Sequence, residues 1–381
     1  MKSSRKSSRP ARKAPQPLRF AVIGLGHIAQ AAVLPAFKHA KGHVKLAALV
    51  SDTPAKLKQL GKRYGVNLLH SYETAASLFK SGDIDAVYIA LPNTLHAEWA
   101  VKAANAGLHV LCEKPLAASS SECREMIEAC DNNDVHLMTA YRLHFERCNL
   151  EVADIVRKKR IGAARFFDSQ FSMQVKAGNI RTKSELGGGP EYDIGIYCLN
   201  AARYVFAADP TQVWATTTNS GDPRFKEVPE TVHVIMRFPE ERIANFICSF
   251  GAADTSRYEI VGTKGSVVVD PAFDYSEPLS YQLEIGEKKT TKKFAKSDQF
   301  APELIYFAEC VRKNRRPEPS GTEGLIDVAI IEGIHRSIAS GRWEALEAAP
   351  DKRRRPTLQQ ERRRAAVPRE PQLVQVESGH S

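Results

Sequence analysis

Three side chains in this sequence could together move a proton and hold a negatively charged oxygen. Lys114 follows an apolar strand pattern, and Asp193 and Tyr197 follow a run of three glycines. Asp193, Tyr197 and Asn200 are spaced i, i+4 and i+7, which places them on one face of a helix predicted over 190–206. Such a polar stripe could face solvent. The glycines before it favour a close approach to another domain, and therefore a cleft.

An ammonium, a phenol and a carboxylate suit the oxidation of an alcohol or hemiacetal by a nicotinamide. Such a reaction needs a base for the hydroxyl proton while hydride leaves the same carbon. Tyr197 is the candidate base if the Lys114 ammonium lowers its phenol pKa from about 10. Lys114 would also bind the reacting oxygen, while Asp193 binds an adjacent hydroxyl and keeps Lys114 charged. The roles can be exchanged, with Lys114 as the proton acceptor.

A glycine-rich loop at 24–29, GLGHIA, predicts a dinucleotide site. The loop follows a strand pattern and opens a helix that is expected to run to about residue 40. Gly24 permits the tight turn, and Gly26 lets the backbone approach a pyrophosphate. His27 and Ile28 open the helix, whose N-terminus faces the phosphate charge. A tight turn without a ligand has the same pattern, but the strand before it and the helix and strand after it favour the dinucleotide.

The end of the second strand bears on the choice between NADP and NAD. Where an acidic residue would bind the adenosine ribose, the sequence has Ser51, with Asp52 beside it and Lys56 after the turn. A hydroxyl and a nearby ammonium suit the 2′-phosphate of NADP. An inward-pointing Asp52 would repel that phosphate and favour NAD. In the structural alternative, Asp52 caps a helix and Lys56 is solvated. The sequence favours NADP, with NAD as the alternative.

Other candidates stand where parallel strands are expected to end, which is where open α/β sheets bind ligands. His96 is a candidate either for cofactor contact or for packing. Arg142 and Arg181 are candidate substrate contacts. The residues expected to bind cofactor at this edge are Leu91, Pro92, Asn93, His96, Glu113 and Lys114. The residues expected to bind substrate are Lys114, Arg142, Arg181, Asp193 and Tyr197.

Two domains must position these residues. From 18 to 145, short β-branched strand patterns alternate with helical ones, which predicts an α/β Rossmann domain with a parallel sheet. From 146 to 347, strand patterns dominate, which predicts an α+β domain with a large, mainly antiparallel open sheet for substrate binding and oligomerisation. The helices expected there are at about 149–158, 190–206, 300–314 and 322–340. The open face of the sheet needs a cover, and a second subunit is expected, in a homodimer or homotetramer.

Length and charge distribution limit the class of protein. A chain of 381 residues exceeds one ordinary hydrophobic core. Its net charge of +10 is concentrated at the ends, with seven basic and no acidic groups in 1–19 and eight basic against four acidic in 351–381. We expect disordered basic tails at 1–17 and 348–381 around a nearly neutral globular part. Nucleic acid is therefore not an expected partner.

Cysteine and apolar patterns point to a reducing, aqueous compartment. The seven cysteines stand singly, without metal-site spacing, so neither a disulfide framework nor a bound metal is expected. The sequence shows no secretory signal pattern and no apolar run near the roughly 18 residues of a membrane helix. We expect a cytoplasmic protein without membrane contact.

The motifs in combination carry a family resemblance. GLGHIAQ, ALVSDTPAKL, YIALPNTLH, VLCEKPLA, AYRLHFE and GGGPEYDIGIYCLN occur in this order within about residues 18–345. The chain resembles the Gfo/Idh/MocA oxidoreductases, and most of all their glucose–fructose oxidoreductase branch. The resemblance implies a Rossmann domain and an open sheet that packs against a partner subunit. It also implies that Lys114 and the DxGxxxxN helix motif bind and activate a sugar or polyol. Tyr197 stands where many relatives have His, and Ser51 with Lys56 matches the NADP arrangement of that branch.

The leading hypothesis is an NADP-dependent oxidoreductase that transfers hydride to or from a sugar, as from an aldose to give a lactone. The same motifs would serve a dehydrogenase or reductase of xylose, anhydrofructose or a dihydrodiol. The alternative class is a non-enzymatic NAD(P)-binding regulator whose basic tails contact nucleic acid. Lys114, Asp193 and Tyr197 count against that class, because a regulator needs no proton-transfer set.

Overall fold

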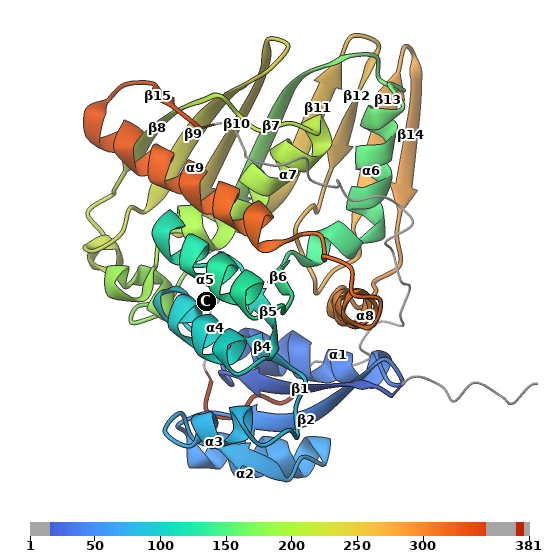
Figure 1. The fold of residues 1–381 in the computed structure, drawn as a ribbon. Coiled ribbons are helices and arrows are strands. Elements are labelled where there is room, and N and C mark those ends of the chain that lie inside the picture. Colours follow the sequence, from blue (N-terminus) through green and yellow to red (C-terminus); the bar gives the residue numbers. More distant parts are fainter. Residues whose placement is uncertain (1–15, 348–370, 377–381) are drawn as a thin grey trace, which may run out of the picture.

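The computed structural model describes residues 16–347 and 371–376, and two sheets organise it (Figure 1). The fold class predicted from the sequence, a Rossmann domain followed by a domain with a large, mainly antiparallel sheet, is confirmed. The two expected tails fall mostly on residues 1–15, 348–370 and 377–381, which lie outside the described residues. Among the described helices, none is long and apolar enough to cross a membrane.

The first domain contains a six-stranded parallel sheet. Its strands are β1 (Leu18–Ile23), β2 (Val44–Val50), β3 (Leu68–His70), β4 (Ala86–Ile89), β5 (His109–Glu113) and β6 (Leu137–Ala140). They lie in the order β3-β2-β1-β4-β5-β6. The order reverses between β1 and β4, and ligands of open α/β sheets bind at such a switch point. The sequence did not indicate β3, because three residues are too short for a recognisable alternation.

Helices cover both faces of this sheet, which is why its strands are mostly apolar. They are η1 (Ala29–Val33), α1 (Leu34–His39), α2 (Pro54–Tyr64), α3 (Ala75–Phe79), α4 (His96–Asn105) and α5 (Ser120–Asn132), with 3₁₀ turns η2 (Asn93–Leu95) and η3 (Arg142–Phe145). One face packs against α1 and the other against α3, α4 and α5. A capping box between Ser119 and Glu122 begins α5.

One helix assigned to the second domain from the sequence packs on the first. Helix α8 (Phe300–Arg312) lies against α1 and β2, and its Leu304 and Phe307 join the apolar core that contains Phe20. The expectation that the helix at 300–314 completes the second domain is therefore wrong. Its sequence is apolar on most sides and so shows a buried helix, but it does not show that the chain returns to the first sheet.

The second domain contains a nine-stranded sheet. Its strands are β7 (Ala164–Ser172), β8 (Gln212–Thr218), β9 (Thr231–Phe238), β10 (Arg242–Ser249), β11 (Thr255–Gly262), β12 (Gly265–Val269), β13 (Ser280–Ile285), β14 (Lys288–Lys293) and β15 (Glu344–Ala345). The order is β14-β13-β12-β11-β7-β10-β9-β8-β15. Neighbours are antiparallel except β7 and β10. The alternation of buried and exposed residues along β9 and β10 shows that the two faces have different environments.

Helices line one face of this second sheet (Figure 1). They are α6 (Arg147–Arg157), α7 (Ile196–Phe206), which continues the π-helical turn η6 (Glu191–Gly195), and α9 (Gly321–Ser340), with 3₁₀ turns η4 (Ile180–Thr182), η5 (Ser184–Leu186) and η7 (Pro223–Phe225). Residues 191–206 thus form the helix that the sequence predicted over 190–206.

Three apolar residues of the second sheet are exposed: Phe166 on β7, and Ile243 and Ile247 on β10.

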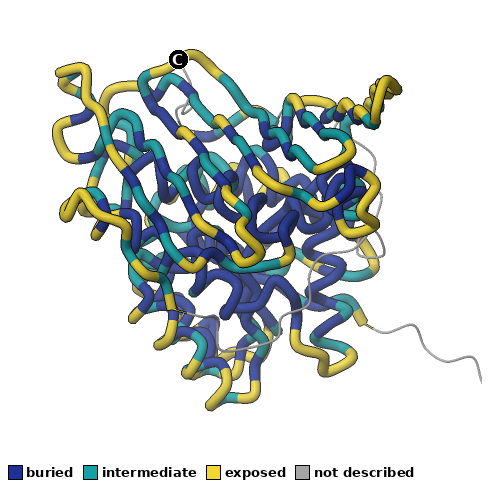
Figure 2. Tube along the Cα trace, turned by 90° about the horizontal axis from the view of Figure 1, so that it is seen from above, coloured by how far each residue is buried: buried dark blue, intermediate teal, exposed yellow. Residues whose placement is uncertain are grey.

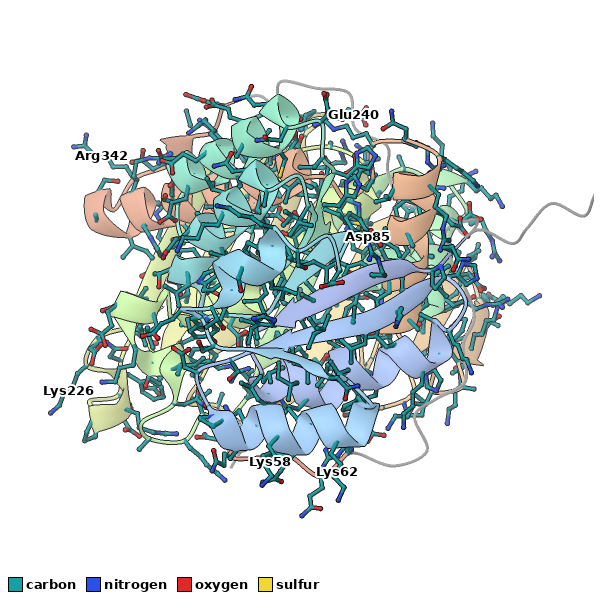
Figure 3. All side chains as sticks on the ribbon, turned by 60° about the horizontal axis from the view of Figure 1, so that its bottom comes forward. Lys58, Lys62, Asp85, Lys226, Glu240 and Arg342 are labelled. Carbon is teal, nitrogen blue, oxygen red and sulfur yellow. The ribbon has the colours of Figure 1, made fainter. Side chains whose placement is uncertain are left out.

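Burial is concentrated where the sheets meet their helices, and the exposed residues lie mostly at the periphery (Figure 2). Figure 3 shows Lys58 and Lys62 projecting from α2, with Lys226, Glu240 and Arg342 at other parts of the surface. All seven cysteines are buried thiols.

Residues 371–376 fall within the tail that was expected to be disordered, but the structure places them against the first domain. Val374 is 5 % exposed and belongs to the same apolar core as Leu25 and Val33. The expectation of disorder is wrong for this segment. Its PQLVQV sequence is more apolar than the arginine-rich stretch before it, but six residues are too few for a periodic pattern.

An ionic cluster joins α7 to α9. Arg203 is fully buried and pairs with Asp209 at 2.8 Å, with Glu323 at 3.1 Å and with Asp327. Asp327 also accepts hydrogen bonds from Asn200 at 2.7 Å and from Tyr141 at 2.5 Å. Since Tyr141 directly follows β6, this cluster connects the edge of the Rossmann sheet to the helix that carries Tyr197.

We expect Arg203→Met to lower the free energy of unfolding by about 3–5 kcal/mol, because it leaves buried carboxylates without their cation. Arg336→Met on α9 is the control, since Arg336 is half exposed and only loosely paired with Glu344. Denaturant unfolding of the two variants and the parent measures the difference. Equal, small losses in both variants would contradict a central role for the Arg203 cluster.

Candidate active site

A cavity of about 740 Å³ lies between the carboxyl edge of the Rossmann sheet and the second domain. It brings together most of the residues singled out from the sequence. The predicted residues that line it are His27, Ile28, Leu91, Pro92, Asn93, Glu113, Lys114, Arg142, Arg181, Asp193 and Tyr197. Ser51, Lys56 and His96 do not line it.

The glycine loop has the form that a dinucleotide requires. Gly24 has φ +88°, and a Cβ there would lie 2.4 Å from the Ala90 carbonyl oxygen, so only glycine fits the crossing of β1 and β4. A Cβ on Gly26 would meet nothing within 4 Å. That open space lies at the start of the helix, where backbone N–H groups attract a pyrophosphate. The residues present therefore fit a nicotinamide dinucleotide.

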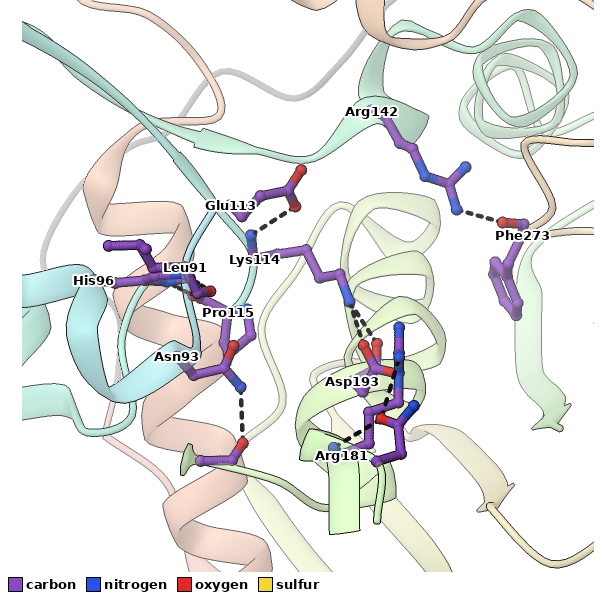
Figure 4. Close-up of polar contacts among 12 residues, drawn as sticks. Leu91, Asn93, His96, Glu113, Lys114, Pro115, Arg142, Arg181, Asp193 and Phe273 are labelled. Carbon is purple, nitrogen blue, oxygen red and sulfur yellow. Dashed lines mark hydrogen bonds and ion pairs between the residues drawn. The ribbon is translucent and has the colours of Figure 1, made fainter. Parts of the chain in front are cut away.

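The Asp193 carboxylate holds two cations from different parts of the chain (Figure 4). Lys114 Nζ at the end of β5 donates to Asp193 Oδ1 at 3.1 Å and to the Asp193 carbonyl oxygen at 2.7 Å. Arg181 Nε on η4 donates to Asp193 Oδ2 at 2.5 Å. An ammonium has three N–H donors, so Lys114 keeps one for a ligand in the cavity.

These contacts fix the charges of the cluster. Burial, the largest single influence, lowers the pKa of Lys114, but the neighbouring acidic groups, Asp193 first among them, together outweigh it, so the net pKa of Lys114 lies above its ordinary value. Burial alone raises the pKa of Asp193, but Arg181 and then Lys114 hold it far below its ordinary value. Lys114 is therefore an ammonium and Asp193 a carboxylate at neutral pH.

Tyr197 lies among cations and aromatic rings. Lys114 Nζ is 4.7 Å from the centroid of its ring, and Arg142 Cζ is 4.9 Å from it. Phe171 and Phe273 pack beside the ring at 5.8 and 6.0 Å between centroids. Two cations and two aromatic rings therefore enclose the Tyr197 ring beside the cavity.

Arg142 is 4 % exposed and is held from the second domain. Its guanidinium donates to the Phe273 carbonyl oxygen at 2.5 Å and to the Gln299 side chain. Its Nε has no hydrogen-bond acceptor among the described residues. As Arg142 also lines the cavity, it can contact a ligand there, as expected from the sequence.

Two buried acids lie behind the cations, and burial opposes their ionisation. The Tyr88 hydroxyl donates to Glu113 Oε1 at 2.8 Å, and burial raises the pKa of Glu113 despite Lys114 nearby. Burial and then the charge of Glu113 raise the pKa of Glu303 well above its ordinary value. Neither carboxylate oxygen of Glu303 meets a donor among the described residues.

The loops of the two domains are joined beside the cavity. Asn93 Nδ2 on η2 donates to the Gly187 carbonyl oxygen at 2.8 Å. Gly187 has φ +74°, and a Cβ there would lie 2.9 Å from the Asn93 Cβ. The glycine run thus permits the close approach between domains that the sequence suggested.

Two polar residues from the sequence stand behind the cavity. His96 is fully buried between the carbonyl oxygens of Leu91 and Pro115, each 2.9 Å from a ring nitrogen. It joins the two strand-edge loops, so the interpretation of His96 as a cofactor ligand is wrong and the packing alternative is right. Asn200 is likewise buried, against His144 and Asp327.

Sequence reasoning missed Tyr275 and Glu303. Tyr275 lies in the loop between β12 and β13, lines the cavity and packs its ring 5.4 Å from Arg142 Cζ. No motif marks a tyrosine in a loop. Glu303 is a single acid in an apolar helix pattern, and that mismatch is a signal that could have singled it out.

Two family models match the chain. A model of an oxidoreductase family with an NAD-binding Rossmann fold matches residues 18–141, and a GFO/IDH/MocA C-terminal domain model matches residues 149–268. The chain belongs to the Gfo/Idh/MocA oxidoreductases. The resemblance drawn from the motifs and the prediction of an NAD(P)-dependent oxidoreductase acting on CH–OH groups are confirmed.

Several relatives of this Gfo/Idh/MocA oxidoreductase act on sugars. D-xylose 1-dehydrogenase (NADP(+)) 2 of Haloferax volcanii is 31% identical over 329 residues, 85% of this chain and 98% of that enzyme. Aldose-aldose oxidoreductase from Caulobacter crescentus, solved with glycerol, is 36% identical with TM-score 0.83, covering 87% of this chain and 100% of that one. A 3-ketoreductase from Actinomadura kijaniata, solved as a tyrosine-to-phenylalanine variant with TDP-benzene and NADP, is 27% identical with TM-score 0.78, covering 85% and 98%.

The buried His96 predicts an acid-sensitive step in the stability of this oxidoreductase. Burial lowers the pKa of His96, so below pH 6.5 the unfolded chain binds a proton that the folded chain resists. Stability is then lost as the pH falls, by up to about 1.4 kcal/mol for each pH unit below 6.5.

We expect His96→Asn to be less stable than the parent at pH 7.5 but to lose less on going to pH 5.5. His70→Asn at the end of β3 is the control, and its pH dependence should follow that of the parent. Denaturant unfolding at both pH values gives the comparison. Parallel losses in all three proteins would contradict the role of His96.

Proposed function

We propose that this enzyme is an NADP-dependent oxidoreductase that transfers hydride between a sugar and the nicotinamide, oxidising an aldose at its anomeric carbon to a lactone. The observation that carries the proposal is the Lys114–Asp193 pair beside Tyr197, in one cavity with the glycine loop. The xylose dehydrogenase and the aldose-aldose oxidoreductase among its relatives support a sugar as substrate.

The roles of the side chains follow from their charges. A bound nicotinamide supplies the hydride acceptor for the sugar carbon. Lys114 is held as an ammonium, so it is a donor to the reacting oxygen and not the proton acceptor. Tyr197, among cations, is the group that accepts the hydroxyl proton as hydride leaves. Of the two assignments that the sequence left open, the proposal therefore takes Tyr197 as the proton acceptor.

Asp193 orients the amine and binds the sugar. Its two carboxylate oxygens are held by Lys114 and Arg181, and the remaining lone pairs can accept from a neighbouring sugar hydroxyl. Arg181 from the second domain and Arg142 from the end of the Rossmann sheet add further donors to the cavity. Apolar groups such as Met173 and Phe171 line the rest, so the cavity offers both the polar and the apolar surface that a pyranose presents.

The second strand supports NADP over NAD. Asp52 Oδ1 accepts a hydrogen bond from the Tyr72 backbone N–H at 2.8 Å, so one carboxylate oxygen is already bound to the next βα connection. Ser51 remains at the end of β2, and Lys56 lies in the first turn of α2. A hydroxyl and an ammonium are therefore the groups offered to a 2′-phosphate.

A second subunit would cover the exposed face of the nine-stranded sheet, in a homodimer or homotetramer. Phe166 on β7 is the register partner of Ile243 on β10, and the two side chains are 44 % and 45 % exposed. Adjacent exposed apolar side chains in the middle of a sheet face favour association with another copy of the chain.

We expect the purified protein to reduce NADP in the presence of at least one member of a panel of aldoses, followed by absorbance of the reduced nicotinamide. Tyr197→Phe should lower the turnover by about 10²–10⁴-fold while nucleotide binding survives, because it removes only the hydroxyl. Tyr192→Phe on the same helix is the control, since its hydroxyl bonds to the Ala118 carbonyl oxygen away from the reaction. Full turnover in Tyr197→Phe would disprove the assigned base.

We expect Lys56→Ala to weaken NADP binding by about 1–3 kcal/mol and to leave NAD nearly unchanged, because it removes one charge-assisted contact with the 2′-phosphate. Lys58→Ala, two residues further along α2, is the control, since Lys58 is exposed. Equilibrium titration with both nucleotides gives the dissociation constants. Equal losses for NADP and NAD, or tighter binding of NAD by the parent, would overturn the assignment.

A further inference from the structure

The segment 371–376 is bound to the first domain beside the glycine loop. It is drawn in red at the Rossmann end of the molecule (Figure 1). The Val374 N–H donates to Gln30 Oε1 at 2.8 Å, and Gln30 Nε2 donates to the Val374 carbonyl oxygen at 3.0 Å. Both backbone groups of Val374 are thus hydrogen-bonded to the Gln30 carboxamide, as they would be to a residue of a neighbouring strand. Arg63 at the end of α2 also donates to the Gln372 carbonyl oxygen, at 2.6 Å.

Gln30 connects this segment to the dinucleotide loop. The side chain is fully buried, and its Nε2 also donates to the Leu25 carbonyl oxygen at 2.8 Å, within the loop itself. The Val374 side chain enters the same core as Leu25. The position of the segment and the conformation of the glycine loop are therefore coupled through one carboxamide and one apolar contact.

The segment also forms part of the wall of the active-site cavity. Pro371 and Leu373 line it together with His27 and Ile28, which open the phosphate-binding helix. Pro371 further lies beside Tyr275 and Phe300, so the segment reaches toward the second domain. A cavity of about 740 Å³ remains in the presence of the segment, which means that the segment bounds this space and does not fill it.

We propose that Pro371, Leu373 and Val374 form part of the nucleotide-binding site, and that the segment acts through them as a strap that slows dissociation of the bound dinucleotide. Pro371 and Leu373 lie where the nucleotide would pass on leaving the phosphate-binding turn. Because the strap belongs to the same chain, it rebinds at a high effective concentration even where its own contacts are few. The proposal rests on dinucleotide binding, but not on the identity of the sugar.

The test compares full-length variants by the rate at which NADPH leaves the protein, measured by nicotinamide fluorescence after mixing with excess NADP. No sugar is present, so a wrong substrate assignment does not affect the result. Val374→Asp puts a charge into the apolar core at the strap. Gln375→Asp adds the same charge at the exposed neighbouring position and is the control.

We expect Val374→Asp to release NADPH about 10- to 100-fold faster than the parent, with Gln375→Asp unchanged, as for the loss of a few weak contacts. A second variant, Val374→Pro, removes the N–H that Gln30 accepts without adding charge, and should also accelerate release. Thermal unfolding without nucleotide checks that the variants are folded. Unchanged release in both Val374 variants would overturn the proposal. Slower release with tighter binding would also overturn it, since the segment would then compete with the nucleotide.

Discussion

The Asp193 carboxylate is the group on which the geometry of the site depends. It stands on a helical turn of the second domain, binds Lys114 from the edge of the Rossmann sheet and binds Arg181 from the loop before the glycine run. A carboxylate this enclosed is stable only with its cations in place, and the cations need it equally. The Lys114–Asp193 pair therefore links the two domains across the cavity. The Asn93–Gly187 hydrogen bond and the Arg203 cluster support the same arrangement from either side.

Three cations face the cavity around this carboxylate, and their arrangement has a chemical use. Lys114, Arg142 and Arg181 line the cavity together with the acidic residues Asp193, Asp254, Asp270 and Asp274, so the cations act locally and not through an excess of positive charge. Burial favours the neutral forms of Glu113 and Glu303 behind them. A cation placed beside an oxygen stabilises the negative charge that the oxygen gains as its proton leaves.

Sequence patterns found the groups that face the cavity when their position followed from a regular element. Lys114 could be predicted because it ends a parallel strand. Asp193 and Tyr197 could be predicted because they are spaced i and i+4 on a helix and so share one face. The same spacing put Asn200 on their face, but its side chain is buried against Asp327, since the helix packs on α9 along that side. His96 shows the same limit: a polar residue at a strand edge can serve the loops themselves. The positions of Tyr275 in the cavity and of helix α8 on the first domain could not be predicted. They depend on how distant segments of the chain pack together, and no local sequence pattern shows this.

The glycine loop is also connected to a segment far along the chain that is not part of the dinucleotide motif. Gly24 is required in the turn because a Cβ there would clash with the Ala90 carbonyl oxygen, at the end of the neighbouring strand. Gly26 borders open space, because a Cβ there would meet nothing within 4 Å. The next turn of the helix presents Gln30, a residue with no role in the motif, whose carboxamide is shared between the Leu25 carbonyl oxygen and Val374. A buried amide with all its hydrogen-bonding groups near partners is costly to leave half satisfied. If Val374 leaves, Gln30 loses both an acceptor and a donor beside the loop. The docking of a short C-terminal segment is thereby tied to the turn that faces the phosphates.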